Sequence, residues 1–259
     1  MLRKEFGQFK NFVFDIDGTI WYWDELIEGA KEAIEALRAE GKEVFFVTNN
    51  SMLSPEGFVK KLKSLGIETD KFHVTCSNEM IVTYLKENGV KRIFCLALEE
   101  AKKYFKESGF EFSESAPECV VIIYNEESEE KLRKAAELMR EGVPAITNAT
   151  GKKWVLKGKV LPGTGVFVEK VEKLSGKKVE IVGKPSDFSV AYVKNKYNLN
   201  PSETIFFGDS LNSDRLFAKK LGWRFAFVLT GEYTMEDLAA LPENDRPEFV
   251  IDSVKEINQ

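Results

Sequence analysis

Apolar strand-like segments alternate with amphipathic helical segments along almost the whole chain, and this alternation limits the possible folds more than any other feature. It begins with a strand-like run at Asn11–Asp15, a helical segment at Gly29–Glu40 and a buried strand at Glu43–Thr48. It returns near the other end of the chain, with strand-like runs at Thr204–Gly208 and Arg224–Leu229. Strands separated by crossover helices are typical of parallel sheets. We therefore expect an α/β fold with a Rossmann-like, doubly wound parallel sheet.

A second set of strands and helices interrupts this first set. Its strand-like segments, which are as apolar as the others, are Lys91–Leu98, Cys119–Tyr124 and Pro144–Thr147. A hairpin is expected around Lys157-Gly158, and the first set resumes with a strand at Glu180–Gly183. We therefore expect a core domain of residues 1–87 and 180–259, interrupted by an inserted α/β domain of residues 88–179.

Composition excludes several classes of protein. The 259 residues are 43% hydrophobic and 31% charged, which is typical of a soluble globular protein, and the net charge of -5 argues against a nucleic-acid binder. We find no apolar run of the roughly 20 residues that a membrane helix needs and no signal-peptide core. The cysteines, Cys76, Cys95 and Cys119, are odd in number and widely separated. These features favour a cytoplasmic protein with reduced thiols and no membrane partner.

The segment Phe12–Thr19 carries the strongest chemical signal. Three apolar residues lead into Asp15 and Asp17, which share one face because alternate residues of a strand point the same way. In parallel α/β sheets ligands bind at the carboxyl ends of strands. Two carboxylates at that end repel each other unless a cation binds or one keeps its proton, and carboxylates suit Mg²⁺. Taken alone, the segment is equally compatible with a simple Asp-Gly turn.

Polar residues follow three more predicted strands. Val47–Ser51 ends a buried strand with hydroxyl and amide groups, although it could also cap the helix that follows. Gly183–Ser186 places a lysine that could equally be a surface charge, and the acids in Phe206–Asp214 could equally form a turn. Four such motifs in this order are hard to explain as turns. The candidate side chains, with the two acids of the first motif, are Asp15, Asp17, Thr48, Asn49, Asn50, Lys184, Asp209 and Asp214.

This combination of motifs resembles the haloacid dehalogenase superfamily of phosphohydrolases. The large insertion between the second and third motifs resembles the subfamily of NagD-like and p-nitrophenyl-phosphatase-like enzymes. The resemblance covers nearly the whole chain and rests on Asp15–Trp21, Thr48–Ser51, Thr147-Asn148, Pro162–Gly165, Gly183–Pro185, Gly208–Asp214 and Leu229–Gly231. It implies the fold of that superfamily, with the insertion forming an α/β cap over the site.

The resemblance also implies roles for individual residues. Asp15 would be the nucleophile that forms an aspartyl-phosphate, and Asp17 would be the general acid and base. Mg²⁺ would be held by Asp15, the backbone carbonyl of Asp17 and Asp209, with Asp214 as an outer ligand or as a residue that orients the others. The phosphoryl group and substrate would be held by Thr48, Asn49, Asn50, Lys184 and Asn148.

The expected activity is a Mg²⁺-dependent phosphatase acting on small phosphorylated metabolites such as sugar phosphates, phosphoglycolate or p-nitrophenyl phosphate. Two other activities use the same residue types. One is phosphotransfer of the mutase kind, and the other is a receiver-like module that is phosphorylated on Asp15 and signals through conformation. Because members of this subfamily often pair through their caps, a homodimer formed in this way is also expected.

Two segments leave the choice of role open. Trp21, Tyr22 and Trp23 fit either packing of a flap beside the site or contact with substrate. In the cap, Asn148 leads into Lys152 and Lys153 where relatives often carry an acid and a proline. Both lysines could point to solvent. If they face the site, they would favour substrates with a second anionic group.

Overall fold

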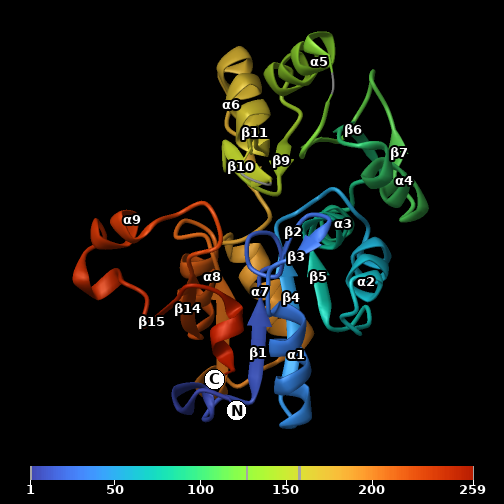
Figure 1. Cartoon of the computed structure of the whole chain (residues 1–259). Coiled ribbons are helices and arrows are strands. Elements are labelled where there is room, and N and C mark those ends of the chain that lie inside the picture. Colours follow the sequence, from blue (N-terminus) through green and yellow to red (C-terminus); the bar gives the residue numbers. More distant parts are fainter. Residues whose placement is uncertain (1, 127, 157–158, 259) are drawn as a thin grey trace.

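The protein contains two parallel sheets, and the smaller one lies above the larger in Figure 1. The computed structural model describes residues 2–126, 128–156 and 159–258. The larger sheet has the order β15-β14-β13-β1-β4-β5, with bounds β1 (Asn11–Phe14), β4 (Glu43–Thr48), β5 (Val74–Cys76), β13 (Thr204–Gly208), β14 (Arg224–Val228) and β15 (Phe249–Ile251). The smaller has the order β12-β9-β8-β6-β7, with bounds β6 (Arg92–Leu96), β7 (Glu111–Phe112), β8 (Cys119–Ile122), β9 (Ala145–Thr147) and β12 (Glu180–Ile181). We call the unit around the larger sheet the core and the unit around the smaller sheet the cap.

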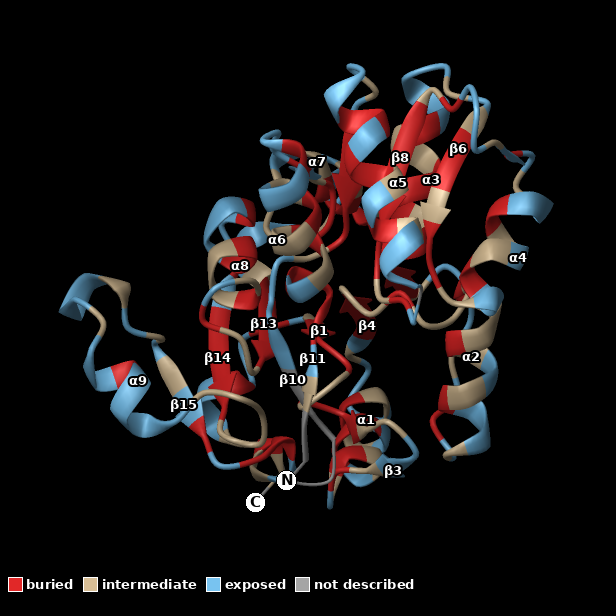
Figure 2. Cartoon of the chain, turned by 90° about the horizontal axis from the view of Figure 1, so that it is seen from above, coloured by how far each residue is buried: buried red, intermediate tan, exposed pale blue. Residues whose placement is uncertain are grey.

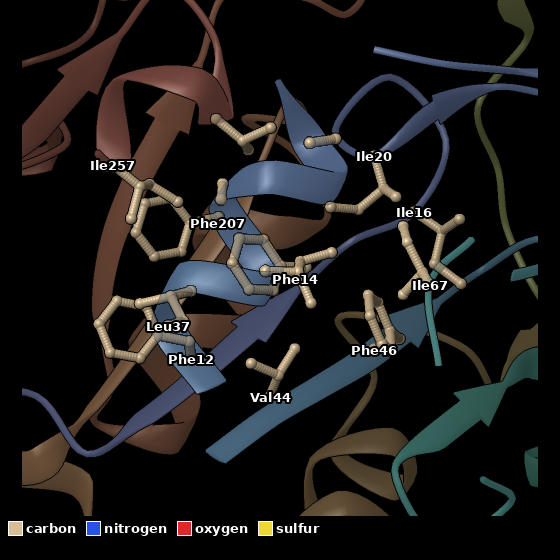
Figure 3. Packing of buried hydrophobic residues seen from close by; sticks show 14 of the residues in the cluster. Phe12, Phe14, Ile16, Ile20, Leu37, Val44, Phe46, Ile67, Phe207 and Ile257 are labelled. Atoms are coloured by element: carbon tan, nitrogen blue, oxygen red, sulfur yellow. The ribbon is translucent and has the colours of Figure 1, made fainter. Parts of the chain in front are cut away.

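Helices cover both faces of the larger sheet because its strands are apolar on both sides. Phe12 and Phe14 of β1 pack on one face with α1 (Ala30–Ala39) and α2 (Pro55–Ser64). Val13 points to the opposite face, which α7 (Asp187–Tyr197) and α8 (Asp214–Leu221) cover. Figure 3 shows Phe12, Phe14 and Phe46 packed together with Leu37 of α1. Each such buried side chain contributes about 1.5–3 kcal/mol, so the strand that carries Asp15 is firmly fixed.

The smaller sheet is covered in the same way. The helices α3 (Ser77–Glu87) and α4 (Glu99–Glu107) pack on one face, and α5 (Glu129–Arg140) and α6 (Thr164–Ser175) pack on the other. Figure 2 shows that buried residues follow the strands of both sheets. The remaining elements are the hairpins β2 (Trp21–Tyr22) with β3 (Glu25–Leu26) and β10 (Lys153–Leu156) with β11 (Lys159–Pro162), the helix α9 (Met235–Ala239), and the 3-10 helices η1 (Lys4–Phe6), η2 (Pro201–Glu203), η3 (Glu243–Asp245) and η4 (Val254–Ile257). None of the helices that the structure describes is long and apolar enough to cross a membrane.

The expected α/β class with parallel sheets is confirmed, but two segments near the expected domain boundaries lie elsewhere. Glu180–Gly183 was expected as a core strand; the strand is shorter, Glu180–Ile181, and pairs with β9 in the cap sheet. The helix α3, expected in the core, buries Met80 and Ile81 against the cap sheet. A short apolar strand or helix fits either sheet, so its local pattern does not tell which one it joins. The turn expected at Lys157-Gly158 lies outside the described residues.

Candidate active site

The strand order brings the predicted motifs together. β1 lies between β13 and β4, and all three strands are parallel, so their carboxyl ends meet at one edge of the sheet. Asp15 follows β1, Thr48 ends β4, and Asp209 follows β13. From β1 the sheet extends through β4 on one side and through β13 on the other, so the strand order reverses at β1. Ligands of doubly wound folds usually bind at such a reversal point.

Lys184 forms hydrogen bonds with two of the acids. Its ammonium Nζ donates to Oδ1 of Asp15 at 2.8 Å, to Oδ1 of Asp214 at 2.7 Å and to the carbonyl of Val47 at 2.8 Å. Its side chain is only 1% exposed, and these contacts use all three of its donors. Burial lowers the pKa of Lys184, but Asp15 and Asp214 outweigh that effect and raise it. These contacts fix Lys184 beside the carboxylates, and its contact with a phosphoryl group stays a prediction.

Asp15, Asp209 and Asp214 form a compact acidic cluster. One carboxylate oxygen from each lies within 4.8 Å of the others. Burial, and then the charge of Asp214, raise the pKa of Asp15 to about 7 despite Lys184. Burial, and then Asp214 and Asp15, also raise the pKa of Asp209 well above its ordinary value. One lysine cannot balance three carboxylates, two of them buried and Asp209 partly buried, so the cluster favours a bound cation or a retained proton.

Two glycines make room for the carboxylate of Asp209. A Cβ on Gly231 would lie 1.7 Å from Oδ2 of Asp209, and a Cβ on Gly18 would lie 2.6 Å from the same oxygen. Gly18 also has φ of 74°, a backbone conformation that other residues adopt only at a cost. The glycine of the Asp-Ile-Asp-Gly motif is thus needed for the close approach of the loop after β1 to the side chain of Asp209, and not only for a turn.

Asp17 is held by two donors beside the cluster. Nε1 of Trp21 donates to its Oδ1 at 2.9 Å, and Nδ2 of Asn50 donates to its Oδ2 at 2.8 Å. Burial raises the pKa of Asp17, and these two hydrogen bonds only partly offset the effect. Trp21 is itself buried and stacks on Phe58 with ring centroids 6.1 Å apart. Of the two roles open for this aromatic segment, Trp21 therefore takes packing beside the site, and it also holds Asp17.

A cavity of about 190 Å³ lies between the core and the cap. Among the predicted residues, those that line it are Asp15, Asp17, Thr48, Asn49, Asn50 and Asn148. The cap adds Tyr124 and Lys153 to the lining. The remaining predicted residues, Lys184, Asp209 and Asp214, are not among its lining residues.

Asn49 and Asn148 line this cavity and form hydrogen bonds with the surrounding backbone. The Asn49 amide is occupied by the backbone of Lys184, donating to its carbonyl at 2.8 Å and accepting from its N–H at 2.7 Å. Nδ2 of Asn148 donates to the Asn49 carbonyl at 2.6 Å, while its buried Oδ1 has no partner among the described residues. Asn49 thus positions Lys184, and a contact of Asn49 with phosphate stays a prediction. Asn148 joins the cap to the end of β4.

Lys152 and Lys153 have different surroundings because adjacent side chains on an extended segment point to opposite sides. Lys153 lines the cavity and forms an ion pair with Glu232 of the core at 3.3 Å. Lys152 pairs with Glu169 of α6 at 2.9 Å and is not among the lining residues. Glu232 is not among the residues predicted from the sequence, because a glutamate in a polar loop carries no local signal of a partner in another domain.

Solved structures of other proteins share this fold over most of their length. The chain is 31% identical to a 4-nitrophenylphosphatase from Thermotoga maritima, with 97% of each chain covered and a TM-score of 0.88. NagD from E. coli K-12 is 23% identical, with 96% of this chain and 98% of that chain covered and a TM-score of 0.84. A glycerol phosphate phosphatase from Mycobacterium tuberculosis in complex with magnesium is 20% identical, with 100% and 79% covered and a TM-score of 0.86. The last two likenesses concern the fold alone.

Sequence comparisons agree with the structural ones. Residues 12–111 match the model of the haloacid dehalogenase-like hydrolases, and residues 181–257 match a second model of such hydrolases. Phosphoglycolate phosphatase 2 of Arabidopsis thaliana is 27% identical over 98% of this chain and 94% of its own length. Human glycerol-3-phosphate phosphatase is 27% identical over 95% of this chain and 88% of its own length. The chain therefore belongs to the haloacid dehalogenase-like hydrolase family. Within it, the chain is a phosphatase of the NagD-like and p-nitrophenylphosphatase-like group.

Proposed function

We propose that this protein hydrolyses small phosphomonoesters with the help of Mg²⁺, through an aspartyl-phosphate on Asp15. The observation that carries the proposal is the placement of Asp15, which lines the cavity on one side and contacts Lys184 on the other. Its carboxylate can meet a substrate phosphorus while Lys184 and the acids behind it stay fixed. The relatives that are phosphatases support hydrolysis over a receiver-like signalling role.

The chemical steps follow from two carboxylates with different surroundings. An oxygen of Asp15 attacks phosphorus, the ester P–O bond breaks, and Asp17 gives its proton to the leaving oxygen. Asp17 then takes a proton from water, the water oxygen attacks phosphorus, and the bond to Asp15 breaks to release phosphate. Burial raises the pKa of Asp17, which favours the protonated carboxyl that the first step needs.

The acidic cluster fits a divalent cation. Asp15, Asp209 and Asp214 supply hard oxygen ligands whose atoms lie within 4.8 Å of one another, and Lys184 leaves their charge partly uncompensated. Asp15 and Asp209, with the backbone carbonyl of Asp17, would hold the ion, and Asp214 would orient Lys184 and the cluster. Mg²⁺ is the expected ion, and when bound it would stabilise the negative charge that develops on the phosphoryl group.

The phosphoryl group would be bound by the end of β4. Thr48 accepts a hydrogen bond from the backbone N–H of Asn50 at 3.0 Å, which fixes its hydroxyl at the cavity wall. We propose that this hydroxyl donates to a phosphate oxygen. In this arrangement Asn49, Asn50 and Lys184 act indirectly, by holding one another and the two catalytic acids.

A panel of phosphorylated metabolites tests the proposal. Purified protein should release phosphate from p-nitrophenyl phosphate and from small aliphatic phosphates with Mg²⁺, and should lose this activity in EDTA. Turnover in chelator equal to that in Mg²⁺ would remove the metal from the mechanism. Absence of phosphate release from every member of the panel would overturn the proposed function.

The partners that we propose are a small phosphorylated substrate and a second copy of the chain, with neither nucleic acid nor membrane. Pairing through the cap is supported by three apolar side chains there that are more than a third exposed, Phe112, Val166 and Leu174. Light scattering of the intact protein measures its mass directly. A monomer at all concentrations up to the millimolar range would exclude the homodimer.

A further inference from the structure

Lys153 brings a positive charge to the cavity that the proposed phosphatase chemistry does not use. It lines the same cavity as Asp15 and Asp17 but comes from the cap hairpin. Its side chain is 56% exposed. Lys184, in contrast, is buried and has all its donors occupied. Lys153 is therefore able to contact the part of a substrate that lies away from the phosphoryl group.

The ion pair of Lys153 with Glu232 is weak enough to exchange. The two charged groups are 3.3 Å apart, and Glu232 is 28% exposed. Pairs that reach solvent in this way contribute little because water screens them and both side chains lose freedom. The positive charge of Lys153 also lowers the pKa of Asp237, although hydrogen bonds from Thr234 contribute more. A carboxylate on a substrate would compete with these acids on similar terms, while a neutral group would leave Lys153 with Glu232.

The size of the cavity limits the distance between the two ends of a substrate. Its volume of about 190 Å³ is smaller than the roughly 300–1,000 Å³ of pockets that hold drug-sized ligands. A phosphoryl group at Asp15 leaves room for only a short chain. The far end of such a chain can therefore reach the cap residues that line the cavity, which include Lys153.

We propose that Lys153 is a specificity-determining residue that binds a second anionic group, a carboxylate, on a small phosphomonoester. In the absence of such a group Lys153 pairs with Glu232, and the substrate carboxylate replaces Glu232 on binding. The proposal rests on the phosphatase activity proposed above and names the class of substrate for that site. Only Lys153 is assigned this role, because Lys152 pairs with Glu169 outside the cavity.

Two substrates of equal length test the proposal. Glycerol 3-phosphate and 3-phosphoglycerate differ only in carrying a hydroxymethyl group or a carboxylate at the end remote from phosphate. The readout is the ratio of kcat/KM for 3-phosphoglycerate to kcat/KM for glycerol 3-phosphate. Lys153→Ala should lower this ratio about 10-fold, the lower range for a hydrogen bond between charged groups. Lys152→Ala is the matched control and should leave the ratio at its wild-type value.

Glu232→Gln separates a substrate contact from a purely structural one. This change frees Lys153 and should raise the ratio by up to about fivefold, in the direction opposite to Lys153→Ala. If the ion pair only held the cap against the core, both variants would break it and would change both substrates alike. Adding Lys153→Ala to Glu232→Gln should remove the gain.

The outcomes distinguish failure of this proposal from failure of the proposed function. Equal effects of Lys153→Ala on both substrates, or hydrolysis of p-nitrophenyl phosphate without hydrolysis of either three-carbon substrate, would overturn the role of Lys153 alone. Absence of hydrolysis of all three substrates with Mg²⁺ would overturn the phosphatase activity and this proposal together. A fall of the kcat/KM ratio in Lys153→Ala together with a rise in Glu232→Gln would support the proposed role of Lys153.

Discussion

The indole Nε1 of Trp21 donates to Oδ1 of Asp17 at 2.9 Å, so a buried residue of the β2–β3 hairpin fixes the carboxyl proposed as the general acid. Trp21→Phe removes this donor while leaving an aromatic ring against Phe58. We expect kcat for an alkyl phosphate to fall about 5–10-fold, because one of the two hydrogen bonds that fix the Asp17 carboxyl is lost. Trp23→Phe is the matched control, since no hydrogen bond joins Trp23 to Asp17 among the described contacts. Equal kcat in the two variants would show that the contact does not position the acid.

Asp17→Asn tests the acid role through the leaving group. A poor alkoxide leaving group needs a proton in the transition state, whereas p-nitrophenolate needs little help. The loss of kcat should therefore be larger for glycerol 3-phosphate than for p-nitrophenyl phosphate. Burst kinetics should accompany the measurement, to show that hydrolysis of the intermediate does not limit both rates. A uniform loss without a burst would argue against the acid role.

Lys184→Met should destabilise the metal-free protein strongly. The change leaves Asp15 and Asp214 buried without their counter-ion, and breaking such a pair costs about 3–5 kcal/mol. The cost should grow from pH 6 to pH 8, because Asp15, whose pKa is about 7, keeps a proton more readily at the lower pH. Denaturant unfolding in EDTA at the two pH values measures it. A change below about 1 kcal/mol at pH 8 would mean that the acids find other compensation.

The raised pKa of Asp15, about 7, predicts how the stability of the metal-free protein depends on pH. Between the ordinary pKa of 3.8 and about 7, the folded state keeps a proton that the unfolded state releases. The free energy of unfolding should therefore fall as pH rises through this window. Tm in EDTA should be lower at pH 8 than at pH 5.5, and Mg²⁺ should raise Tm most at pH 8. Asp15→Asn should lose part of this pH dependence, and an equal dependence in the variant would assign it to other groups.

Local sequence patterns were sufficient to predict much of the fold. The bounds of β4 and β13 agree with the prediction because each strand is a short apolar run with a clear polar or glycine boundary. The alternation of strands and helices also predicted parallel sheets. This alternation did not predict that β12 joins the cap sheet, because the sheet that a strand joins depends on packing partners distant in sequence.

The same distinction applies to the site. The residue types at strand ends indicated which acids would gather, and the structure places Asp15, Asp209 and Asp214 together. Their contacts depend on geometry that no local pattern encodes. Lys184 is occupied by carboxylates, and Lys153 finds Glu232 across the boundary between cap and core.

Steady-state phosphate release by Asp15→Asn tests the central claim most directly. With saturating Mg²⁺ and p-nitrophenyl phosphate, the variant should be at least about 10³-fold slower than the wild type, because it lacks the nucleophile. Its Tm in EDTA at pH 8 should equal or exceed that of the wild type, since the change removes a buried negative charge from a crowded acidic cluster. A folded Asp15→Asn protein that keeps more than about a tenth of the wild-type rate would contradict the covalent mechanism.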